Sequence, residues 1–234
     1  MIEYNKQDRL NNIFKGLVII GMFFIITFFK EVPLVLFGIK YDALALTAKE
    51  LYSASLEIIM ILILYLVFEN QIKKAWADLK QNHLKYFSEN FKYYLLGIIL
   101  MFSSNFLINL LGGGMSGNET AIRDQFEIAP IFTFISSVIL APLLEEGIFR
   151  LGFRNVFKNN FIFILLSGLV FGGLHLLAGA SIHLLALYLV SYCSFGVIFA
   201  YMLVKTNNIF VSLGFHMMHN GILMSIQMLI FIFG

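Results

Sequence analysis

The sequence predicts an all-α fold, a polytopic transmembrane bundle of about seven to eight helices. Of its 234 residues, 59% are hydrophobic and only 13% are charged, whereas a soluble domain carries about 25% charged residues. Long apolar segments cover residues 16–29, 51–68, 93–111, 131–157, 161–177, 183–203 and 209–233. No low-complexity linker or internal repeat separates them. We therefore expect residues 1–234 to form a single integral membrane domain.

Each apolar segment except the first approaches the ~20 residues that span a bilayer. The first lies between Lys15 and Lys30, whose side chains can reach the interface and so lengthen it. No small-residue cleavage site follows it, so this helix is expected to stay uncleaved. Residues 32–39 are apolar and predict a re-entrant or interfacial piece, which leaves an eighth helix open. Residues 69–92 carry the only tryptophan, Trp76, with mixed charge, which indicates an interfacial helix or a partner surface.

The distribution of lysine and arginine predicts the topology. With the N-terminus inside, segments on the inner side hold twelve of these residues and segments on the outer side hold four. Positive charge concentrates on the cytoplasmic side of membrane proteins, so we expect the N-terminus inside and the C-terminus outside. The short loops rich in lysine and asparagine are typical of a bacterial plasma-membrane protein. The expected partners are membrane lipid and a membrane-associated peptide or protein substrate.

Several function classes are disfavoured. No basic cluster with interleaved aromatic residues indicates nucleic-acid binding. Cys193 is the single cysteine, so no intrachain disulfide can form, and its apolar surroundings favour a packing role. The stretch 114–117 has the G-x-S-G form of rhomboid proteases, but its loop is polar and no matching histidine helix follows. No cofactor is predicted, and the sequence does not indicate an oligomeric state.

Two adjacent carboxylates, Glu145 and Glu146, interrupt the apolar segment 131–157. An ionised group at bilayer depth costs at least about 2.5–3.5 kcal/mol, so such groups face a watery cavity or a partner. Glu146 and Arg150 are four residues apart on a helix and can pair, which would fix the charge and orientation of this turn. Glu145 then lacks a local partner and suits a proton acceptor. The alternative is a helix that ends before Glu145, with both carboxylates solvated.

Polar residues from three predicted helices converge on one layer. The polar break at residues 159–160 joins two antiparallel helices, so Glu145 lies opposite His175, each about 20 Å from the inner end. The same reasoning from the polar break at residues 207–208 places His216 about 12 Å and Asn220 about 18 Å from that end on the last helix.

Other residues near this layer have smaller predicted roles. Phe171 lies one helical turn from His175 on the same face. His219 is three residues from His216 and adjacent to Asn220, so it could replace either of them, but it ranks below both. His183 is expected at the outer interface. The G-x-x-x-G pattern of residues 168–172 predicts close helix packing.

This set of side chains predicts peptide hydrolysis with water as the nucleophile. Glu145 and His175 can hold and deprotonate a water molecule. His216 and the Asn220 amide can donate hydrogen bonds to an oxyanion. No serine or cysteine has a base at matching depth, which disfavours covalent catalysis.

Three ordered motifs carry a resemblance to a known family. They are Glu-Glu-x-x-x-Arg (Glu145, Glu146, Arg150), Phe-x-x-x-His (Phe171, His175) and His-x-x-x-Asn (His216, Asn220). Over residues 131–222 the chain resembles the CAAX-processing and bacteriocin-processing membrane peptidases, also called the CPBP or Abi family. The resemblance implies a metal-independent glutamate endopeptidase, with Glu145 and His175 activating water and His216 and Asn220 forming the oxyanion hole. Members of this family commonly have glycine directly after the arginine, whereas here Leu151 separates Arg150 from Gly152. This departure concerns packing more than chemistry.

Two alternatives remain open at this point. A metallopeptidase could use Glu145, Glu146, His175 and His216 as zinc ligands, although no H-E-x-x-H motif is present. From a different class, the protein could be a non-catalytic scaffold or bacteriocin-immunity protein that regulates a sensor kinase or binds a peptide.

Overall fold

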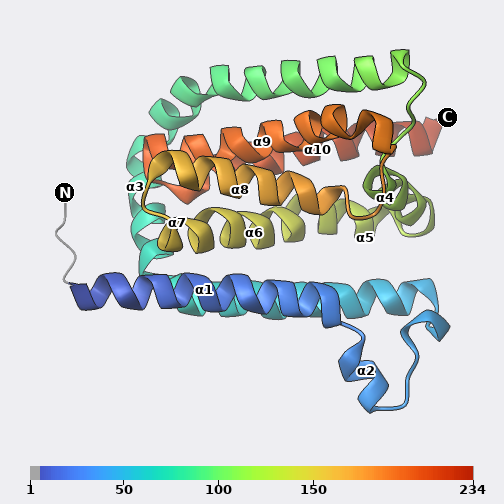
Figure 1. Ribbon diagram of the computed structural model, residues 1–234, viewed down its shortest axis with the longest axis horizontal. Helices are drawn as coiled ribbons and strands as arrows, with labels where there is room; N and C mark the ends of the chain where they lie inside the picture. Colours follow the sequence, from blue (N-terminus) through green and yellow to red (C-terminus); the bar gives the residue numbers. More distant parts are fainter. Residues whose placement is uncertain (1–5, 234) are drawn as a thin grey trace.

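The computed structural model describes residues 6–233, and within this range it contains helices and no strand. This confirms the predicted all-α class. Five of the described helices are long and apolar enough to cross a membrane, so the chain is a multi-pass membrane protein. The beginning of α1 and the end of α10 lie at opposite ends of the bundle (Figure 1).

The first helix, α1 (Lys6–Phe29), contains the predicted segment 16–29, and the preceding five residues lie outside the described range. It packs closely on the segment around Gly152. A Cβ added at Gly16 would lie only 2.7 Å from the Gly152 carbonyl oxygen. The apolar stretch after it forms α2 (Val32–Leu36), which starts with a proline and lies away from the bundle (Figure 1). Five residues are too few to cross a bilayer, so α2 adds no eighth spanning helix.

A short 3₁₀ turn, η1 (Tyr41–Ala43), leads into α3 (Leu46–Leu110), the longest helix of the described chain. Figure 1 shows α3 running beside α1, crossing one end of the bundle and returning along the opposite edge. The first change of direction falls at Phe68, whose φ of −109° and ψ of 16° are not helical. One helix therefore supplies two of the predicted membrane segments, and the predicted interfacial residues 69–92 form the part that crosses the bundle end. Five of the described helices are long enough to span the membrane, and α3 alone contributes two spans. Together with the shorter α8, they account for the seven predicted segments.

At the far end of the bundle, α4 (Gly117–Ile128) begins with a side-chain cap. The Ser116 hydroxyl accepts a hydrogen bond from the Glu119 amide at 3.2 Å, the Ser-x-x-Glu arrangement of a helix start. The same hydroxyl is bonded to the Tyr192 hydroxyl. The serine of the G-x-S-G pattern therefore starts a helix.

The segment with the paired carboxylates is one continuous helical rod that contains two wide turns. It comprises α5 (Pro130–Ile135), η2 (Ser136–Leu140), α6 (Ala141–Glu145), η3 (Glu146–Gly152) and α7 (Phe153–Val156). Both η2 and η3 are π-helical, a rare geometry that occurs mostly as short insertions in α-helices and is frequent at functional sites. The helix does not end before Glu145, so the two carboxylates lie inside the bundle.

The remaining helices complete the bundle: α8 (Asn160–His175), a 3₁₀ turn η4 (Ile182–Leu184), α9 (Leu185–Thr206) and α10 (Ile209–Phe233). Asn159 caps α8 by accepting a hydrogen bond from the Ile162 amide at 3.0 Å.

The glycines of α8 bring it close to α9. A Cβ added at Gly168 would lie 2.9 Å from the Val197 nitrogen, and one at Gly172 would lie 2.7 Å from the Cys193 nitrogen. The predicted close approach at the G-x-x-x-G pattern is therefore present.

Candidate active site

The centre of the site is a buried ion pair at the start of η3. Glu146 Oε1 lies 3.2 Å from Arg150 Nη2, and both side chains are almost fully removed from solvent. The Arg150 guanidinium lies over the ring of Phe171 at 4.9 Å and near that of Phe199 at 5.7 Å. Its Nη1 also donates to the Ser167 hydroxyl at 3.5 Å. The predicted pairing is therefore present, and aromatic faces from α8 and α9 enclose the cation and attract it.

His216 on α10 lies between the two carboxylates. Its Nδ1 is 3.0 Å from Glu146 Oε1, and its Nε2 is 3.5 Å from Glu145 Oε2. The ring of Phe199 packs beside it, with 5.1 Å between ring centres. Because Glu146 occupies Nδ1, Nε2 is the nitrogen left to face Glu145. The buried ion pair thus sets the orientation of the imidazole, as outer hydrogen-bond partners do for catalytic histidines.

His175, at the C-terminal end of α8, approaches Glu145 from the other side. Its Nε2 lies 3.9 Å from Glu145 Oε1, which is too long for a direct hydrogen bond. Its Nδ1 is 2.8 Å from the Phe171 carbonyl oxygen, and a carbonyl can only accept, so Nδ1 carries a proton. In the neutral ring, Nε2 is then the basic nitrogen that faces Glu145. A gap of this kind between two polar groups is where a bridging water is expected.

The structure brings Glu145, His175 and His216 together, as their depths predicted. Asn220 lies one turn further along α10, where its side-chain amide donates to the Ser137 carbonyl oxygen in η2 at 2.8 Å. His219 lies beside Tyr94 and Phe195, with its Nδ1 3.5 Å from the Tyr94 hydroxyl. His219 thus belongs to a different cluster of side chains from the two carboxylates.

Sequence reasoning missed Tyr192. Its ring stacks on that of His175, with centres 5.3 Å apart and planes inclined by 24°, and its hydroxyl is bonded to Ser116. The aromatic ring therefore holds one face of His175 while Phe171, at 4.6 Å, packs on the ring as well. A tyrosine inside an apolar helix was the available signal, because its hydroxyl needs a partner when buried.

The site is partly open, since Glu145 keeps 20% of its side-chain surface exposed. Among residues 6–233, no group of three or more histidine, cysteine, aspartate or glutamate side chains is arranged to hold a metal ion.

A membrane bundle that encloses a carboxylate between two imidazoles contains the groups that acid–base chemistry requires. Comparison with known proteins shows a similarity over part of the chain. Residues 127–222 match the family "Type II CAAX prenyl endopeptidase Rce1-like", so this part of the chain is similar to the CAAX-processing peptidases that the three motifs indicated.

One curated relative is the "Putative membrane peptidase YdiL" of Bacillus subtilis (strain 168), which is 33% identical over 119 residues. The match covers 50% of this chain and 45% of the relative, so the chain spans less than half of the length of that protein in the alignment. No solved structure matches the chain significantly.

Proposed function

We propose that the protein is an intramembrane endopeptidase that hydrolyses peptide bonds of membrane-associated peptides or proteins. The observation that carries this proposal is the position of Glu145, with His175 Nε2 3.9 Å away on one side and His216 Nε2 3.5 Å away on the other. The family match and the membrane-peptidase relative support a protease in the membrane.

In the proposed reaction, a water molecule occupies the gap between Glu145 and His175. Glu145 takes a proton from this water, and the oxygen adds to the carbonyl carbon of the substrate. The C–N bond then breaks, and the proton passes from Glu145 to the leaving amine. General base catalysis of this kind contributes about 10²–10⁴-fold to the rate. The Phe171 carbonyl holds His175 so that Nε2 faces the water.

The negative oxygen of the tetrahedral intermediate requires hydrogen-bond donors. His216 Nε2 faces the same space, and its role as a donor requires both ring nitrogens to carry a proton, because Nδ1 is directed at the Glu146 carboxylate. The Asn220 amide has two N–H groups, of which the Ser137 carbonyl occupies one. The second N–H is available to a substrate oxygen. The Glu146–Arg150 pair positions His216 through its Nδ1 contact.

The experiment compares three forms in proteoliposomes with a library of membrane peptides, using mass spectrometry to find products. These forms are the wild type, Glu145→Gln and Glu127→Gln, the last removing an exposed carboxylate on α4. We expect cleavage by the wild type and Glu127→Gln, and a loss of about 10²–10⁴-fold in Glu145→Gln. Equal cleavage by Glu145→Gln would exclude the proposed base.

The non-catalytic alternative makes a different prediction in cells. If the protein were only a scaffold or an immunity protein, Glu145→Gln would leave the cellular phenotype unchanged. A catalytic role requires that the phenotype be lost with the carboxylate.

A further inference from the structure

Glu57 is an ionisable residue of the first membrane segment of α3 that the proposed mechanism does not use. Its Oε2 atom is buried and has no hydrogen-bond partner among the described residues. A carboxylate oxygen at this depth is costly to leave unsatisfied. Water or another polar partner is therefore expected beside this oxygen.

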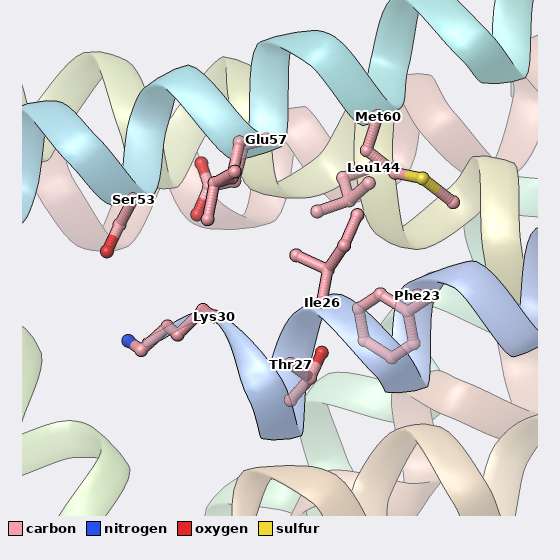
Figure 2. Close-up of a pocket in the computed structure, with 9 residues that line it drawn as sticks. Phe23, Ile26, Thr27, Lys30, Ser53, Glu57, Met60 and Leu144 are labelled. Atoms are coloured by element: carbon pink, nitrogen blue, oxygen red, sulfur yellow. The ribbon is translucent and has the colours of Figure 1, made fainter. Parts of the chain in front are cut away.

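Glu57 lines a cavity of about 190 Å³ between α1, α3 and α6. The polar residues that line it are Thr27, Lys30, Ser53 and Glu57. Figure 2 shows Ser53 and Glu57 extending from α3 toward α1, with Lys30 beyond the end of α1. The other lining residues are apolar, so these four residues are the polar part of an otherwise apolar cavity.

The cavity has the size and the partners that ordered water needs. One water requires about 10–15 Å³ of such volume and two to four polar partners, so the space can hold on the order of ten waters. A hydrated cavity would satisfy the free Glu57 oxygen. A lipid chain in the same place would leave that oxygen without a partner.

The cavity also reaches the depth of Glu145 in the bundle. Leu144, which forms part of its wall, directly precedes Glu145. Glu57 lies eleven residues before the bend at Phe68, and Glu145 lies eleven residues before the end of α7 at Val156. At 1.5 Å per residue both lie about 16 Å from the same end of the bundle.

We propose that this cavity is a water-filled vestibule that leads from the Lys30 end of the bundle to Glu145, and that Glu57 keeps it hydrated. The part that concerns hydrolytic water rests on the proposed function. The hydration itself does not, and it can be measured without any substrate.

The first experiment uses thiol labelling in a Cys193→Ser background, which removes the single native cysteine. Cysteine is introduced by Ser53→Cys and Leu56→Cys in the vestibule, which leave Glu57 in place, and by Ile58→Cys as a control next to Glu57 on the exposed face of α3. A charged, membrane-impermeant thiosulfonate is added to the side that carries Lys30. Because the thiolate is the reactive form and requires water, we expect Ser53→Cys and Leu56→Cys to react at least about tenfold faster than Ile58→Cys.

Equal labelling of the three positions would overturn the vestibule, and so would labelling from the opposite side alone. Ser53→Cys and Leu56→Cys both retain Glu57, so each tests the cavity independently if the other variant folds poorly.

The second experiment measures hydrolysis by Glu57→Leu and Glu57→Gln. We expect Glu57→Leu to lower kcat about tenfold with little change in KM, because it removes water and leaves the substrate contacts in place. Glu57→Gln should retain most of the rate, since an amide still binds water. If Glu57→Leu has the same kcat as the wild type, the role of Glu57 in supplying water is overturned. Labelling without any wild-type hydrolysis would instead count against the proposed function and leave the vestibule standing.

Discussion

Glu146 and Arg150 form an ion pair that the bundle removes from solvent on every side, with 3.2 Å between Oε1 and Nη2 and side-chain exposures of 1% and 0%. Removing one member of such a pair leaves the other charge buried and costs about 3–5 kcal/mol. We therefore expect Arg150→Met to lower the free energy of unfolding by about this amount. Unfolding in detergent measures it.

The chain provides a matched control for this prediction. Glu119 and Arg123 on α4 have the same spacing, but their side chains are 43% and 46% exposed. Arg123→Met should cost at most about 1 kcal/mol. In the double variant Glu146→Gln with Arg150→Met, the loss should be smaller than the sum of the two single losses, since neither charge remains unpaired. Additive losses would show that the pair does not act as a unit.

Gly172→Ala should destabilise the packing of α8 on α9. The added Cβ would lie 2.7 Å from the Cys193 nitrogen, and overpacking of this kind costs about 1–3 kcal/mol. Gly173→Ala is the control on the same turn, because nothing lies within 4 Å of a Cβ there. Alanine is a better helix former than glycine, so this control should leave stability unchanged or raise it. Similar losses in both variants would contradict the close approach at Gly172.

Asn220→Ala should reduce kcat by about 10²–10³-fold with little change in KM, because an oxyanion donor acts mainly in the transition state. Met218→Ala, which changes a partly exposed residue of the same helix, serves as the control and should retain activity. If kcat stays unchanged in Asn220→Ala, the amide serves only to tie α10 to the Ser137 carbonyl.

Treatment with a strong chelator should leave peptide hydrolysis unchanged, because the proposed chemistry is carried by the side chains of Glu145, the two histidines and Asn220. The control is a known zinc peptidase treated in parallel. Loss of activity that zinc restores would identify the metallopeptidase alternative, with Glu145, Glu146, His175 and His216 as its ligands.

Much of this arrangement followed from local rules. The spacing of Glu146 and Arg150 predicted their pairing, since residues four apart share a helix face. The polar break at Asn159 and the fixed rise of a helix predicted that His175 would reach the level of Glu145.

Other features depend on contacts between distant segments, which no local pattern specifies. The bend of α3 at Phe68 carries no proline or glycine signal at that residue. The bond from Asn220 to the Ser137 carbonyl joins residues 83 positions apart. Glu57 was visible as a lone carboxylate in an apolar segment, but its cavity exists only once α1 packs against α3.

The wide turn of η3 matters for anyone who wishes to transplant this site. Successive residues of an ordinary α-helix are about 100° apart around the axis, and a π-helical turn holds more residues per revolution. A designed scaffold with a straight helix in place of Glu146–Gly152 would therefore present Glu145 and Arg150 at a different relative angle. A scaffold that copies only the six residues from Glu145 to Arg150 would have the same side chains, but they would point in different directions around the helix axis.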